Sequence, residues 1–169
     1  MLELSFDDRR RIYDTLVYMA WGDERLDPSE ITLARVVAEE LDLDGHGVAA
    51  GAVLQGGPPL LGDVGLDRLA SGARHVAYAT AAWMAFADGY EHPAERAVLT
   101  TLRYRLGLDE ETAFVLESSA LLIGLQGGAT PLRAQYRALL HAIEDVLGAE
   151  PQRGVLLHGP DDAEAGAAT

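Results

Sequence analysis

The fold of this chain is decided by the sequence WMAFADGYEHPAE at positions 83–95, which has a weaker copy, YMAWGDERLDPSE, at positions 18–30. The copies lie 65 residues apart, since Met84 aligns with Met19 (84 − 19 = 65). Each copy contains an apolar stretch, an acidic turn, and a proline followed two residues later by a glutamate. Self-similarity at a fixed spacing indicates an internal repeat. The sequence therefore predicts a fold that is built twice.

Local signals around the first copy predict two helices joined by the acidic turn. Ser5, followed closely by two aspartates, is a favourable helix start, and Gly22 ends the apolar periodicity of that helix. Asp27, Pro28 and Glu30 form the next start, with a capping side chain, a proline at the first position and a glutamate that bonds back to the cap. The first half thus begins as helix–turn–helix.

The rest of the chain continues the helical pattern, and no segment alternates with the period of a strand. We therefore expect an all-α, seven-helix single domain over residues 1–150, in which two three-helix repeats pack on each other and a C-terminal helix closes the core. The tail over 151–169 is acidic and rich in small residues, a composition typical of disorder. The expected parts are a first repeat over about 5–57 with its third helix over about 46–55, a second repeat over about 67–128 whose first helix begins near 67, and a closing helix over about 131–147.

Composition limits the classes of partner. The net charge is −14 and there is no cysteine, so nucleic acid is an unsuitable partner, and disulfides and thiolate metal sites are excluded. Cations, or a basic face of a protein partner, match the charge better. The sequence has neither a secretory signal nor an apolar run of the ~20 residues that span a bilayer. We expect a cytoplasmic protein that does not insert into membranes.

The repeated turns carry the candidate site residues. Each copy has one acid in the turn and another seven residues later, namely Asp23 with Glu30 and Asp88 with Glu95. One turn alone is not a calcium-binding loop, because apolar residues stand at two of the ligand positions. Two turns that face each other would gather four carboxylates, whose oxygens suit Ca²⁺, Mg²⁺ or Mn²⁺. The four acids are therefore predicted metal ligands.

A second interpretation gives the same acids a purely structural role. Glu30 and Glu95 stand where capping-box glutamates bond back to the start of their own helices. His92 occupies the position of Asp27 and is expected to cap or to face water rather than to bind a metal. The two interpretations are compatible when they concern different oxygens of one carboxylate.

Motifs of catalysis are missing from the sequence. There is no Gly-x-Ser-x-Gly, no phosphate-binding loop, no His-Glu-x-x-His and no dinucleotide fingerprint. We therefore expect a non-enzymatic protein with no catalytic residues and no organic cofactor. A metal-dependent hydrolase built on the four acids is kept as an alternative.

The residues Met84–Gly89, Pro93–Glu95 and Leu106–Leu108 resemble the signature of the TerB-like family. This family comprises the tellurite-resistance TerB proteins and the N-terminal domain of a membrane-anchored DnaJ-type co-chaperone. The resemblance covers about residues 5–147, and the first copy departs from it in having Glu24 where the family usually has glycine. That departure puts the shape of the first turn in question, because glycine tolerates positive φ and glutamate does not.

The resemblance implies a compact helical fold and an acidic metal-ion site. Residue by residue, the family's turn acid and helix acid fall on Asp88 and Glu95, and on Asp23 and Glu30 in the first copy. It also implies a role in stress response to tellurite, with a protein partner in a membrane-associated assembly. The alternative from a different class is a structural interaction module whose acids only cap helices.

Overall fold

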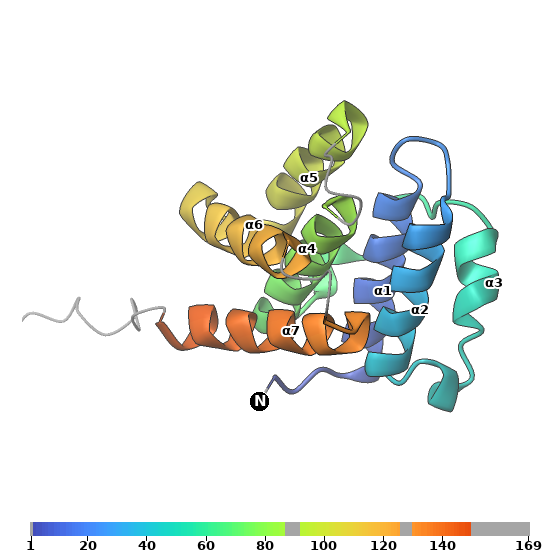
Figure 1. The fold of residues 1–169 in the computed structure, drawn as a ribbon, viewed down its shortest axis with the longest axis horizontal. Coiled ribbons are helices and arrows are strands. Elements are labelled where there is room, and N and C mark those ends of the chain that lie inside the picture. Colours follow the sequence, from blue (N-terminus) through green and yellow to red (C-terminus); the bar gives the residue numbers. More distant parts are fainter. Residues whose placement is uncertain (1, 87–91, 126–129, 150–169) are drawn as a thin grey trace, which may run out of the picture.

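The computed structural model describes residues 2–86, 92–125 and 130–149, so Asp88 and the tail over 151–169 lie outside the described residues. Within these ranges the chain forms seven α-helices, two short 3₁₀ helices and no strand (Figure 1). The prediction of an all-α fold with seven helices is confirmed. The α-helices are α1 (Phe6–Ala20), α2 (Pro28–Glu40), α3 (Ala50–Gln55), α4 (Ser71–Ala85), α5 (Pro93–Leu106), α6 (Glu110–Leu125) and α7 (Leu132–Ala149).

Helix α4 lies at the centre of the molecule. It packs along α1 and contacts α5, α6 and α7, while α2 and α3 cover α1 from the other side (Figure 1). Its residues are almost all buried, and many are alanines, which allow neighbouring helices to approach closely. Trp83 of α4 packs against Tyr136 of α7, with ring centroids 5.5 Å apart. The core is therefore one continuous cluster shared by all parts of the fold.

The helix starts follow the local sequence signals. The Ser5 hydroxyl accepts a hydrogen bond from the backbone N–H of Asp8 at 3.1 Å, which caps α1 as predicted. Asp27 caps α2, with Pro28 in the first helical turn. These caps satisfy backbone donors that a helix leaves unpaired at its N-terminus.

Two predicted helix boundaries were wrong. The third helix, expected over about 46–55, is a 3₁₀ turn at Asp44–His46 followed by α3. The chain is interrupted at Gly47, whose φ of 78° lies in the left-handed region that ends a helix. The helix expected from about 67 begins at Ser71, because a 3₁₀ turn at Leu66–Arg68 precedes it.

An arginine at the start of α1 and another at the start of α4 make matching hydrogen bonds. Arg9 donates from Nε to the carbonyl oxygen of Leu4 at 3.2 Å and from Nη1 to that of Leu41 at 3.5 Å. Arg74, 65 residues later, makes the same two bonds at 3.0 and 3.5 Å. Its acceptors, also 65 residues later, are Leu69 and Leu106.

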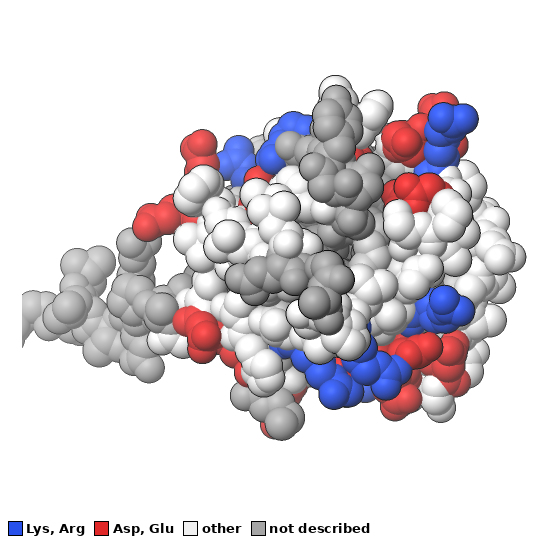
Figure 2. Space-filling view, viewed as in Figure 1, with Lys and Arg blue, Asp and Glu red and all other residues white. Residues whose placement is uncertain are grey.

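Helix α7 is joined to α2 by ion pairs. Arg137 Nε lies 2.8 Å from a carboxylate oxygen of Glu40, and Arg133 pairs with both Glu39 and Glu40. Figure 2 shows arginines and acids side by side where these helices meet. None of the helices in the three described ranges is both long and apolar enough to cross a lipid bilayer.

Candidate functional site

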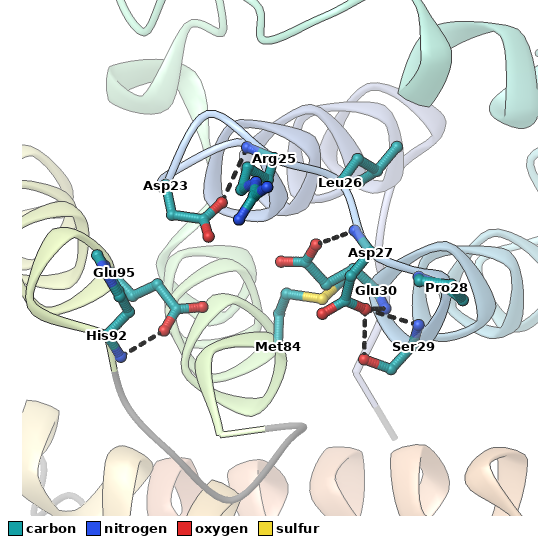
Figure 3. A pocket seen from close by; sticks show the side chains of 10 residues that line it. All are labelled: Asp23, Arg25, Leu26, Asp27, Pro28, Ser29, Glu30, Met84, His92 and Glu95. Carbon is teal, nitrogen blue, oxygen red and sulfur yellow. Dashed lines mark hydrogen bonds between the residues drawn. The ribbon is translucent and has the colours of Figure 1, made fainter.

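A pocket of about 400 Å³ opens where the turn between α1 and α2 faces the start of α5 (Figure 3). The last turn of α4 contributes Met84, whose thioether forms part of its apolar wall. The carboxylates of three predicted site residues point toward one opening in Figure 3. They are Asp23 in the turn, Glu30 at the start of α2 and Glu95 at the start of α5.

The turn and α5 are close because Gly22 has no side chain. A Cβ atom at this position would lie 3.3 Å from Cγ2 of Val98 and 4.0 Å from Cα of Glu95. Glycine therefore lets the backbone before Asp23 approach α5. This contact is what brings acids from the two sequence copies to the same pocket.

Both glutamates also cap their helices. Oε2 of Glu30 accepts a hydrogen bond from the backbone N–H of Asp27 at 2.8 Å, and Oε2 of Glu95 accepts one from that of His92 at 2.8 Å. The ring nitrogen Nδ1 of His92 in turn accepts from the N–H of Ala94 at 3.2 Å. The capping role is therefore confirmed for one oxygen of each glutamate. In Figure 3 the second carboxylate oxygen of Glu30 faces the pocket.

The first turn keeps its shape at some cost in backbone strain. Oδ1 of Asp23 accepts a hydrogen bond from the N–H of Arg25 at 2.9 Å, which closes a tight turn. Between them, Glu24 has a φ of 66°. A non-glycine residue in the left-handed region is disfavoured by about 1–2 kcal/mol. The substitution of glutamate for glycine in this copy is thus accommodated without loss of the turn.

The pocket raises the proton affinity of Glu30. This residue is only 9% exposed, and burial raises its pKa to about 7, outweighing the hydrogen bond from Asp27, which lowers it. The negative charges of Asp27, Asp23 and Glu95 raise the pKa further. Near neutral pH the carboxyl group is therefore partly protonated, and a positive charge in the pocket would favour its ionised form.

The spacing of the acids favours a hydrated ion over a directly ligated one. Within residues 2–86, 92–125 and 130–149, no three Asp, Glu or His side chains are grouped closely enough to hold a metal ion. Asp88, the fourth predicted ligand, lies outside these ranges. The pocket nevertheless has room for several waters, each of which occupies about 30 Å³ in the liquid. The oxygen-only donor set suits hard cations that keep part of their hydration shell.

Sequence analysis did not identify two residues of the pocket. Arg25 lines its mouth, and Met84 lines its wall. The position of Arg25, two residues after an aspartate in a tight turn, is a signal that could have indicated the former. Met84 has the spacing of an ordinary core residue, so its contact with the pocket was not predictable from the chain alone.

Comparisons of the chain with models of protein families, with curated proteins and with solved structures find no match. The likeness to the TerB-like family therefore rests on the residues of the repeated motif.

Proposed function

We propose that this chain is a non-enzymatic domain that binds a divalent cation in the acidic pocket. The observation that carries the proposal is the convergence of Asp23, Glu30 and Glu95, which come from turns about 65 residues apart in the sequence, on one pocket. Carboxylates that share a pocket repel one another, and a bound cation relieves that repulsion. The cation supplies this charge compensation, and no chemical step is assigned to the site.

The two sides of the pocket belong, in this proposal, to two copies of one three-helix unit, with α7 as the closing helix. The matching hydrogen bonds of Arg9 and Arg74 support this duplication. So do the capping boxes at Glu30 and Glu95, which lie 65 residues apart. A cation held between two such units would link them, as the repeated acids predict.

Each residue has a distinct part in binding. Glu30 uses one oxygen as a helix cap and presents the other to the cation, while Glu95 caps α5 from the opposite side. Asp23 is held toward the pocket by its bond to the backbone of Arg25. Because the acids are spaced apart, waters complete the coordination, as is common for Mg²⁺ and Ca²⁺.

The resemblance to the TerB-like family extends this proposal to the cell. A duplicated helical domain with an acidic cation site is what that resemblance implies. We propose a role in stress response of the tellurite-resistance type, exercised through a protein partner in a membrane-associated assembly. Growth of a deletion strain on tellurite, with and without the Asp23→Asn gene, is the direct test of this role.

A second candidate function is favoured by the capping boxes. If Asp27, Glu30, His92 and Glu95 serve only to start helices, the protein is a structural interaction module without a cation site. Both candidates need the caps, so substitution of the glutamates does not separate them. Asp23 makes no cap for α2 or α5 and is the residue that does.

Thermal unfolding of EDTA-treated protein, titrated with Ca²⁺, Mg²⁺ and Mn²⁺, separates the two functions. A cation that binds only the folded state adds about 2.7 kcal/mol of stability at a hundredfold excess over Kd. We expect a saturable rise in Tm with at least one ion, which Asp23→Asn reduces while leaving the metal-free Tm unchanged. Asp63→Asn, an exposed aspartate outside the pocket, is the matched control.

Two results would contradict cation binding. The first is no rise in Tm with any of the three ions at millimolar concentration. The second is an equal rise in the wild type, Asp23→Asn and Asp63→Asn, which would indicate non-specific screening of the acidic surface. Either result would leave the structural module as the supported function.

A further inference from the structure

Helix α6 is apolar on both of its sides. Its inner side packs into the core through Ala113, Leu116 and Ala120. A helix that is apolar all round is normally buried on all sides, yet the outer side of α6 is solvent-exposed. The large apolar side chains of this outer face are Phe114 (70% exposed), Val115, Leu121, Leu122 (58% exposed) and Leu125 (67% exposed).

The outer face carries almost no charge, although the chain as a whole has a net charge of −14. No charged residue occurs between Ser118 and Leu125, and Glu111 is the exposed charge at the N-terminal end. In Figure 2 the described surface over α6 is white, with acids toward that end. Depletion of charge around large apolar side chains is typical of the centre of a protein interface.

The spacing of the outer residues indicates that a helix covers them. Phe114, Ser118, Leu121 and Leu125 are separated by four, three and four residues. This is the alternation that lines the seam between two packed helices. Ser118 is small and lies in the middle of the series, so a second helix can approach closely there.

We propose that this face is the interface of a homodimer, in which two copies of α6 pack antiparallel across a two-fold axis. A two-fold interface must be self-complementary. The series meets this condition, because antiparallel pairing sets Phe114 opposite Leu125 of the second copy and Ser118 opposite Leu121. The small residue then faces a large one, which gives interlocking packing.

Charge selects the antiparallel arrangement over the parallel one. Parallel pairing would bring Glu110 and Glu111 of both copies together at one end. Antiparallel pairing separates these two acidic ends by the length of α6, which at 1.5 Å per residue is about 24 Å. That distance is well beyond the screening length of about 8 Å at physiological salt. The uncharged face is also where two strongly acidic molecules can approach with the least repulsion.

The size of the face limits the strength of the dimer. Five partly exposed side chains on one helix supply less than the ~800 Å² that each partner buries in a standard interface. We therefore expect a reversible dimer that dissociates on dilution.

Sedimentation velocity of the full chain, from low micromolar to near-millimolar concentration, tests the proposal. We expect the wild type to shift from monomer to dimer and Leu122→Glu to remain a monomer, with unchanged helicity by circular dichroism. Leu60→Glu is the matched control, because Leu60 is 74% exposed but lies outside α6. A wild type that is monomeric throughout overturns the proposal and leaves residues 150–169 or a foreign helix as the occupant. A dimer that survives Leu122→Glu overturns it as well.

Cysteine cross-linking tests the orientation, since the chain contains no native cysteine. A mixture of Phe114→Cys and Leu125→Cys proteins should form a mixed disulfide under mild oxidation, because antiparallel pairing brings these positions together. Each variant alone should cross-link slowly. Faster self-linking of Phe114→Cys than mixed linking would overturn the antiparallel dimer. The disulfide is read on a gel and does not depend on cation binding, so it is independent of the proposed function.

Discussion

Glu30 is a buried carboxyl group surrounded by other acids, and this makes stability depend on pH. Its folded pKa of about 7 exceeds the model value of 4.5, so the folded state binds the proton more tightly than the unfolded chain does. The contribution to stability is therefore full below about pH 4.5 and is lost as pH rises through 7. After allowance for screening by water in the open pocket, the loss is about 2 kcal/mol.

Glu30→Gln should remove this dependence. The amide still accepts the capping bond from Asp27, as glutamine does in other capping boxes, but it cannot ionise. We expect its free energy of unfolding, measured by urea denaturation without metal, to change less between pH 5 and pH 8 than that of the wild type. The variant should be the more stable of the two at pH 8. An identical pH profile for both proteins would show that Glu30 is not the group responsible.

Glu24, with its φ of 66°, is a second residue whose effect can be measured. Glu24→Gly should stabilise the protein by about 1 kcal/mol, because glycine removes the left-handed strain and loses part of the gain to its own chain entropy. Glu24→Ala is the control, since alanine keeps Cβ and hence the strain. Equal stability of the two variants would count against strain at this turn.

The helices show which local signals in the sequence are sufficient. The caps at Ser5 and Asp27 were predictable because each uses a side chain within three residues of the helix start. The third helix of the first half was predicted too long, since the pattern alone does not show that Gly47 adopts positive φ. The pairing of Arg137 with Glu40 was not predictable, because these residues are 97 positions apart and meet only through the packing of α7 on α2.

The contact between the α1–α2 turn and α5 gives a prediction that leaves every carboxylate in place. Gly22→Ala would set a Cβ 3.0 Å from the carbonyl oxygen of Met19 and 3.3 Å from Val98. We expect a loss of about 1–3 kcal/mol in stability from overpacking, together with weaker cation binding because Asp23 moves away from Glu95. Gly62→Ala is the control, since nothing lies within 4 Å of a Cβ there. Unchanged cation affinity in Gly22→Ala would argue against a pocket that needs both turns.

The two copies of the motif were sufficient to predict that acids from both turns share a corner of the fold. The proton affinity of Glu30 was beyond sequence analysis, because it depends on burial by the second copy and on the approach allowed by Gly22. The place of Asp88 in the site remains a prediction, since it lies outside the described residues. The exposed side of α6 was likewise hidden in the sequence, where its leucines look like ordinary core positions.

The net charge of −14 gives the proposed dimer a definite response to salt. Two acidic molecules repel each other over long distances, and salt screens that repulsion without weakening an uncharged contact. We expect the dimer dissociation constant to fall as sodium chloride is raised from low to physiological concentration and beyond. Analytical ultracentrifugation at several salt concentrations measures this. A dissociation constant that rises with salt would indicate an interface held by ion pairs instead.

The central position of α4 has a consequence for how the protein opens. A helix that is enclosed by α1, α5, α6 and α7 cannot expose its amides unless those neighbours separate. Its backbone amides should therefore exchange with deuterium only through global unfolding, at a free energy equal to that of denaturation. Helix α3, which is short and packs only on α1 and α2, should exchange through local opening and much faster. Hydrogen exchange followed by mass spectrometry would thus show one slow axis, with the periphery free to fluctuate around it.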